Sequence, residues 1–178
     1  MKWNRVLLKL SGEALAGPKK TGFDEATVKE VARQVKLSVE AGVEVGIVIG
    51  GGNFWRGRTS NAIDRTKADQ IGMLATVMNC IYVSELFRNE GMKTEILTPF
   101  ACGSMTKLFS KDLANEYFGQ GKVVFFAGIE ENRVLHRPEK LVDVLLLHPQ
   151  HPPGQGVEGG LVHLLGVVLL PAPGQQDF

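Results

Sequence analysis

Along the first 128 residues, short apolar runs alternate with longer amphipathic stretches. A short apolar run is typical of a strand buried in a parallel sheet, and apolar residues at three- and four-residue intervals are typical of a helix. Strands that alternate with helices predict an α/β fold with a mainly parallel sheet. The pattern predicts strands over residues 5–10, 43–49, 93–97 and 122–127. It predicts helices over residues 24–41, from residue 64 or 67 to 87, and over residues 107–118.

The first predicted helix has a clear signal at each end. Asp24 can accept hydrogen bonds from the N–H groups of the first turn, and Gly42 is a typical stop. Because this helix joins the first two strands, we expect a βαβ unit with parallel strands and a right-handed crossover.

The second predicted helix is apolar on two nearly opposite sides. Such a helix must be covered on most of its surface. We expect one side to lie on the sheet, and the other either against a second subunit or inside the core of a monomer. One stripe comprises Ile71, Leu74, Ala75, Met78, Ile81 and Tyr82, and the other Met73, Val77, Cys80, Ser84 and Phe87.

The strand at 43–49 stops at three consecutive glycines, followed by the sequence N-F-W-R-G. Three glycines weaken a strand, so this position requires bare backbone. The usual reason is the close approach of an anion to main-chain N–H groups, often at the start of a following helix. Arg56 adds a planar cation suited to phosphate. The pattern predicts a phosphate-binding turn at the carboxyl end of a strand.

Two charged residues outside this turn have competing interpretations. Lys9 interrupts the apolar run 5–10, just before Ser11 and Gly12. It is either an edge-strand lysine that extends into water or a compact cation aimed at a phosphate. Asp69, taken alone, is a surface carboxylate near the start of a helix, where the helix dipole favours it. The loop from Glu13 to Gly22 is expected to be exposed.

The overall composition is typical of a soluble globular domain, with 44% hydrophobic and 22% charged residues in 178. A net charge of +1 provides no overall attraction to nucleic acid or to a membrane. Cys80 and Cys102 have no metal-ligand spacing and form no disulfide framework, which fits a reducing cytoplasm. We expect no signal peptide, no membrane span and no metal site.

The composition changes near Gly128. All four histidines and six of the eight prolines follow this residue, whereas serine, threonine, methionine, tyrosine and tryptophan are absent there. Residues 1–128 carry 17 basic and 13 acidic groups, a net charge of +4, and residues 129–178 carry 3 and 6, a net charge of −3. We therefore expect two parts. In the second, the apolar run 141–147 is a candidate strand, and the run 161–170 could dock on a sheet edge or drive aggregation.

Three motifs occur in order and resemble the bacterial UMP kinases of the amino-acid-kinase superfamily. A triple glycine alone is shared with carbamate and acetylglutamate kinases, but the third motif argues against those enzymes. The resemblance covers residues 1–128. The motifs are L-L-K-L-S-G-E-A-L at residues 7–15, I-G-G-G-N with R-G at residues 49–57, and D-Q-I-G-M-L-A-T-V-M-N at residues 69–79.

This resemblance implies a three-layer α/β/α sandwich and a cytoplasmic homohexamer. It implies transfer of the γ-phosphoryl group of MgATP to UMP, with GTP as an allosteric activator bound near residues 13–22. Such transfer depends on positioning and charge neutralisation more than on a covalent nucleophile. By the resemblance, Lys9 and Arg56 are catalytic, ATP is bound by Lys9, Leu10, Ser11, Gly12, Gly52 and Arg56, and UMP is bound by Gly51 and Asp69.

The sequence departs from the family after the last predicted strand. Family members continue into a Gly-Thr-Gly loop and residues that hold UMP, whereas this chain has Gly128-Ile129-Glu130-Glu131-Asn132. Nothing in residues 129–178 resembles the ATP-binding half. Two expectations follow: a UMP kinase, or a catalytically inactive fragment that binds nucleotide phosphate or oligomerises. A truncated or frameshifted reading frame would explain the departure, and sequencing the coding DNA tests it.

Overall fold

A computed structural model describes residues 4–56, 62–128 and 165–169, the last as backbone only. Within these residues, six strands form one sheet in the order β4-β3-β5-β2-β1-β6. Strands β1 to β5 pair in parallel, and β6 pairs antiparallel with β1. The strands are β1 (Arg5–Leu10), β2 (Glu44–Ile49), β3 (Thr94–Thr98), β4 (Lys107–Leu108), β5 (Val123–Phe126) and β6 (Leu165–Leu169), and the helices are α1 (Gly12–Leu15), η1 (Gly17–Lys19), α2 (Glu25–Glu40), α3 (Arg65–Asn89) and α4 (Lys111–Gly119).

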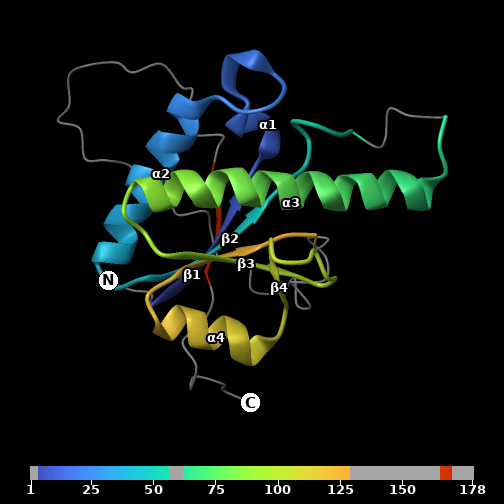
Figure 1. The fold of residues 1–178 in the computed structure, drawn as a ribbon. Coiled ribbons are helices and arrows are strands. Elements are labelled where there is room, and N and C mark those ends of the chain that lie inside the picture. The colour runs from blue at the N-terminus through green and yellow to red at the C-terminus, as the bar shows by residue number, and fades with distance from the viewer. Residues whose placement is uncertain (1–3, 57–61, 129–164, 170–178) are drawn as a thin grey trace.

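Helices cover both faces of the sheet (Figure 1). Helices α2 and α3 lie on one face and α4 on the other. Successive side chains of β1 alternate between the two cores: Leu8 and Leu10 pack with α2 and α3, whereas Leu7 packs with α4. This arrangement confirms the predicted three-layer α/β/α sandwich with a mainly parallel sheet.

The local signals at the ends of α2 act as predicted. The carboxylate of Asp24 accepts hydrogen bonds from the hydroxyl and the backbone N–H of Thr27, at 2.7 and 3.0 Å. These bonds, the hydroxyl first, lower the pKa of Asp24. Gly42 follows the helix with a φ of +83°, a conformation that favours glycine. The parallel β1–α2–β2 unit is confirmed.

Only one apolar stripe of α3 is covered. Val77, Cys80 and Phe87 belong to the core between the helix and the sheet, and burial raises the pKa of the Cys80 thiol. Across the described residues most of the other stripe remains exposed, although Ala75 is buried and Tyr82 half-buried. The expectation of a helix enclosed in a monomer core is therefore wrong for this part of the chain. The exposed members of this stripe are Ile71 (39%), Leu74 (53%), Met78 (48%) and Ile81 (37%).

Helix α3 is also long and apolar enough to cross a membrane, although no membrane span was expected. Its most apolar window has a mean hydropathy of 1.2, and 44% of that window is buried. The core helix of a soluble protein meets the same criteria, and α3 packs on the sheet in that way.

Two local expectations were wrong. The segment 13–22 is not a wholly exposed loop, because α1 and η1 form there and Leu15 is fully buried. The last predicted helix begins later than residue 107, because the hydroxyl of Ser110 caps it by accepting from the N–H of Leu113 at 3.1 Å. Residues Lys107–Leu108 form β4 instead.

The backbone of β6 lies beside β1, which confirms docking of the run 161–170 on the sheet for residues 165–169. Strand β1 therefore has neighbours on both sides, and the edge-strand interpretation of Lys9 is wrong. The candidate strand at 141–147 and the four histidines lie outside the described residues.

Candidate functional site

The carboxyl ends of β1, β2 and β5 lie side by side because these strands are parallel neighbours. Ligands bind at this edge in open α/β sheets. Strand β1 leads into Ser11 and Gly12, β2 leads into Gly50–Gly52, and β5 leads toward Gly128. The first two loops are joined directly, since the N–H of Gly50 donates to the carbonyl of Leu10 at 2.9 Å.

Gly12 allows these two loops to approach each other. A Cβ atom at this position would lie 2.2 Å from the carbonyl oxygen of Gly50 and 2.6 Å from Oδ1 of Asn53. No side chain fits at such distances. The requirement for glycine at position 12 is therefore set by the packing of one site loop on the other.

The glycine turn, defined here as residues 50–52, exposes part of its main chain. Gly50 is exposed, and Gly51 and Gly52 are half-buried. The carbonyl of Gly51 accepts from the N–H groups of Phe54 and Trp55, both at 3.0 Å. Within the described residues, the N–H groups of Gly51 and Gly52 donate to no acceptor. Backbone N–H groups in this arrangement suit an anion.

The glycine turn differs from the predicted one in its relation to the next helix. Helix α3 begins only at Arg65, so its N-terminus does not form the turn. The turn instead packs against the side of α3, where a Cβ atom on Gly51 would lie 3.0 Å from Cβ of Ala75 and 3.1 Å from the carbonyl oxygen of Gly72.

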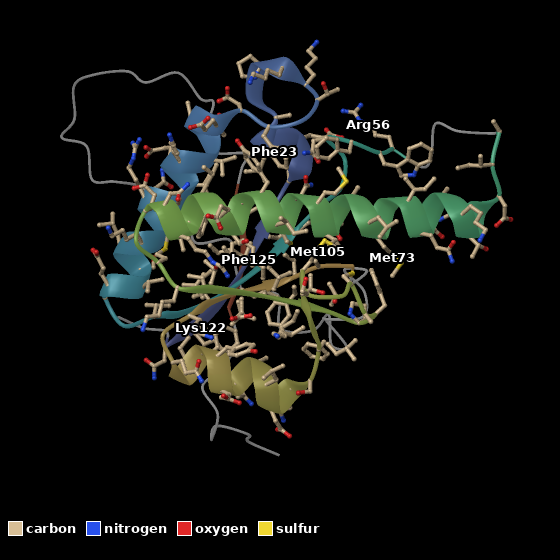
Figure 2. The ribbon with its side chains drawn as sticks, viewed as in Figure 1. Phe23, Arg56, Met73, Met105, Lys122 and Phe125 are labelled. Atoms are coloured by element: carbon tan, nitrogen blue, oxygen red, sulfur yellow. The ribbon has the colours of Figure 1, made fainter. Side chains whose placement is uncertain are left out.

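Arg56 lies next to the glycine turn, on the side of α3 where α1 is found (Figure 2). Its Nε lies 3.1 Å from the carboxylate of Glu13 and 3.5 Å from the carbonyl oxygen of Gly52. Both charged side chains are more than half exposed, so their ion pair adds little stability. Arg56 is therefore placed to exchange this carboxylate for the phosphate of a ligand.

The other predicted ATP-binding residues, which lie in β1 or directly after it, differ in exposure. The side chain of Lys9 is exposed and belongs to the same face of the sheet as Leu7, the face that carries α4. Leu10 is fully buried, so only its main chain can face a ligand. Ser11 is half-buried and precedes α1, without a side-chain capping bond.

Asp69 lies in the second turn of α3, three residues before Gly72. Residues at this spacing share a helix face, so Asp69 belongs to the face that meets the glycine turn. Its carboxylate lies 3.5 Å from Nε of Arg65, and both side chains are exposed. The structure thus brings Gly12, the glycine turn, Arg56 and the Asp69 face of α3 to one edge of the sheet.

Thr76 and Gly128 were not among the predicted site residues. The N–H of Gly128 donates to the Thr76 hydroxyl at 2.7 Å, and this hydroxyl donates to the carbonyl of Met73. A Cβ on Gly128 would lie 2.6 Å from the ring of Phe100, and its φ is +68°. Threonine inside the third motif was the available signal, but its partner is 52 residues away.

Asn53 and Asn79 belong to the second and third motifs, but the sequence predicted no role for them. Both side chains are buried, at 2% and 0% exposure, and their amides form two hydrogen bonds to each other. A polar residue inside the apolar stripes of α3 was the available signal for Asn79.

The comparisons with known proteins agree with this fold. The sequence matches the amino acid kinase family over residues 4–143, a range that continues past the composition change at Gly128. The structure is similar to a UMP kinase from Bacillus anthracis, with 31% identity and a TM-score of 0.68, covering 72% of this chain and 54% of that one. It is also similar to a UMP kinase from Ureaplasma parvum, with 26% identity and a TM-score of 0.67, covering 72% and 55%.

This chain therefore spans about half the length of the two solved UMP kinases. The family match covers most of the chain, and the matched fold contains the edge of the sheet described above. The chain belongs to the amino acid kinase family.

Proposed function

We propose that this chain is a UMP kinase that transfers the γ-phosphoryl group of MgATP to UMP, giving UDP. The observation that carries the proposal is the glycine turn, where the N–H groups of Gly51 and Gly52 lie beside Arg56 without an acceptor among the described residues. Two such N–H groups and a nearby cation are complementary to a nucleotide phosphate. The names of the two similar structures support UMP as the acceptor.

Each site residue has a role in the proposal. Lys9 and Arg56 neutralise charge on the transferring phosphoryl group, which is the main requirement of this reaction. The main chain from Leu10 to Gly12 and that of Gly52 hold the ATP phosphates, with Mg²⁺ entering as part of MgATP. Gly51 and Asp69 hold UMP.

A second candidate is a catalytically inactive fragment that binds nucleotide phosphate. The observation in its favour is that the family match stops at residue 143 and the composition changes after Gly128, while the groups of an active site act as a unit. This candidate retains the glycine turn as a phosphate site but not the transfer step.

Turnover of UMP with MgATP separates the two candidates. We expect the purified chain to form UDP and ADP in equal amounts, measured by coupled spectrophotometry and by chromatography of the products. CMP and AMP in place of UMP serve as controls and should give less product. Binding of ATP by calorimetry without any UDP would support the inactive fragment, and absence of both binding and turnover would contradict both candidates.

The exposed stripe of α3 supports a further proposal, that the chain forms a homo-oligomer, a hexamer by analogy with the family, with this stripe as a subunit contact. Contiguous exposed apolar side chains of this kind mark interaction surfaces. We expect the wild-type chain to exceed the monomer mass in light scattering coupled to size exclusion, and Leu74→Glu with Met78→Glu to shift it toward monomer. Leu37→Glu on α2, where Leu37 is 69% exposed, is the matched control. A monomeric wild type would contradict this contact.

Two further proposals concern where the enzyme acts in the cell and which nucleotide activates it. We propose that the enzyme acts in the cytoplasm and that GTP activates it by binding near residues 13–22. Adding GTP to the same coupled assay tests the second point, since activation should raise the rate at fixed UMP and MgATP.

A further inference from the structure

Two buried side-chain amides, those of Asn53 and Asn79, hold the backbone of the glycine turn by hydrogen bonds. Nδ2 of Asn79 donates to the carbonyl of Gly50 at 2.7 Å and to Oδ1 of Asn53 at 2.8 Å. Nδ2 of Asn53 donates to Oδ1 of Asn79 at 3.0 Å and to the carbonyl of Gly22 at 2.9 Å. All four N–H bonds of the two amides therefore have acceptors.

The geometry admits only one orientation of these amides. If the amide of Asn79 were turned over, its oxygen would face the carbonyl oxygen of Gly50, and its nitrogen would face the nitrogen of Asn53. Both contacts would be repulsive, because carbonyl oxygens only accept and amide nitrogens only donate. The bonds of the pair thus define the direction of the Gly50 carbonyl.

The direction of that carbonyl determines the direction of the neighbouring N–H. The carbonyl of Gly50 and the N–H of Gly51 belong to the same planar trans peptide, in which the two bonds point in opposite directions. Because Asn79 holds the carbonyl of Gly50 toward the interior, the N–H of Gly51 points away from the buried side-chain amide of Asn79. This is the N–H that has no acceptor in the described part of the chain.

We propose that Asn79, supported by Asn53, is a positioning residue that aims the N–H of Gly51 at the phosphate of bound UMP. Neither side chain touches the ligand, since both are buried. The carbonyl of Asn53 also accepts from the N–H of Gly22 at 3.3 Å, so the pair fixes the end of the segment 13–22 relative to the turn. This inference rests on the proposed function for its ligand, but the orientation of the turn can be measured without one.

The test compares two variants with wild type. Asn79→Leu removes the donor to Gly50 and leaves the Asn53 amide without its partner, so it should lower both stability and UMP affinity. The double variant Asn53→Ala with Asn79→Leu removes both amides, and replacing both partners of a buried polar pair is far less destabilising than removing one. A structural role predicts that UMP affinity recovers together with stability in the double variant. A positioning role predicts that stability recovers while affinity does not.

Cys80→Ala is the matched control, because Cys80 is the next residue of α3, is fully buried and belongs to the apolar core between the helix and the sheet. For Asn79→Leu and the double variant we expect the Kd of UMP, measured by calorimetry, to rise about tenfold. We expect amide hydrogen exchange over residues 50–56, measured by mass spectrometry without ligand, to rise by about the same factor. Cys80→Ala should change neither quantity.

Wild-type UMP affinity and wild-type exchange over residues 50–56 in the double variant would overturn the inference. Failure of the proposed function has a different signature, namely binding of neither UMP nor ATP by the wild-type chain. In that case the exchange measurement still decides whether the amide pair orients the turn. If Asn79→Leu does not fold, the double variant alone supplies both measurements.

Discussion

Replacing Gly12 with alanine is expected to abolish nucleotide binding and to destabilise the fold. A Cβ at this position would lie 2.2 Å from the Gly50 carbonyl oxygen and 2.6 Å from Oδ1 of Asn53. Neither atom can yield easily, because the first is backbone in the glycine turn and the second belongs to the buried amide pair. The turn must therefore move away from β1. Overpacking of this kind costs about 1–3 kcal/mol or more of unfolding free energy.

Urea unfolding and ATP calorimetry on Gly12→Ala measure these two effects. Gly119→Ala is the matched control, since a Cβ at Gly119 meets nothing within 4 Å and its backbone needs no positive φ. The control should retain wild-type affinity and equal or slightly greater stability. If Gly12→Ala binds ATP as tightly as the control does, the close approach of the two loops is not required for the site.

The second large effect is expected for Lys9→Met. In the proposed reaction Lys9 neutralises the transferring phosphoryl group, and removing one preorganised electrostatic contact of this kind lowers kcat by about 10²–10³-fold. The side chain is exposed near the carboxyl end of β1, so its replacement by methionine should leave the fold intact. Arginine is not an equivalent replacement, because its planar fork differs from a compact ammonium group.

The initial rate of UDP formation at saturating MgATP and UMP measures this effect. Lys107→Met, which removes an exposed lysine from edge strand β4, is the matched control and should keep the wild-type rate. For a chain that binds ATP without turnover, the ATP dissociation constant replaces the rate as the readout. An unchanged rate and an unchanged dissociation constant in Lys9→Met would remove Lys9 from the site and leave it as a surface lysine.

The elements that were predicted well depend on local signals. The ends of α2 follow from Asp24 and Gly42, which act within one helical turn. The buried strands follow from apolar runs of strand length, and their parallel pairing follows from the intervening helices. These features need no knowledge of the rest of the molecule, which is why hydrophobic periodicity was sufficient.

The errors concern features that depend on tertiary packing or on a competing local signal. The burial of Leu15 arises because α1 folds against the core that also contains Val28, and composition alone favoured a loop. The start of α4 was misplaced because the capping serine, Ser110, lies inside the apolar pattern that suggested residue 107. The neighbours of β1 could not be predicted, because β6 comes from residues 165–169.

In the candidate site, too, features set by local sequence were predicted and features set by tertiary contacts were missed. The sequence pattern marked the glycine turn and Arg56 because glycine runs and an adjacent cation are local features. The amide pair could not be found in this way, since Asn53 and Asn79 are 26 residues apart and meet only when the turn packs on α3. The contact between Thr76 and Gly128 spans 52 residues and was missed for the same reason.

The central claim is that the main chain of the glycine turn binds nucleotide phosphate, and its amide resonances test this most directly. The chain is labelled with ¹⁵N-glycine, the signals of Gly51 and Gly52 are assigned by single alanine substitutions, and ATP and UMP are titrated separately into the wild type. We predict a saturable shift of the Gly52 signal with ATP and of the Gly51 signal with UMP, with the signals of Gly119 and Gly42 unchanged. Binding of either nucleotide without movement of its signal, or no binding at all, would contradict the account.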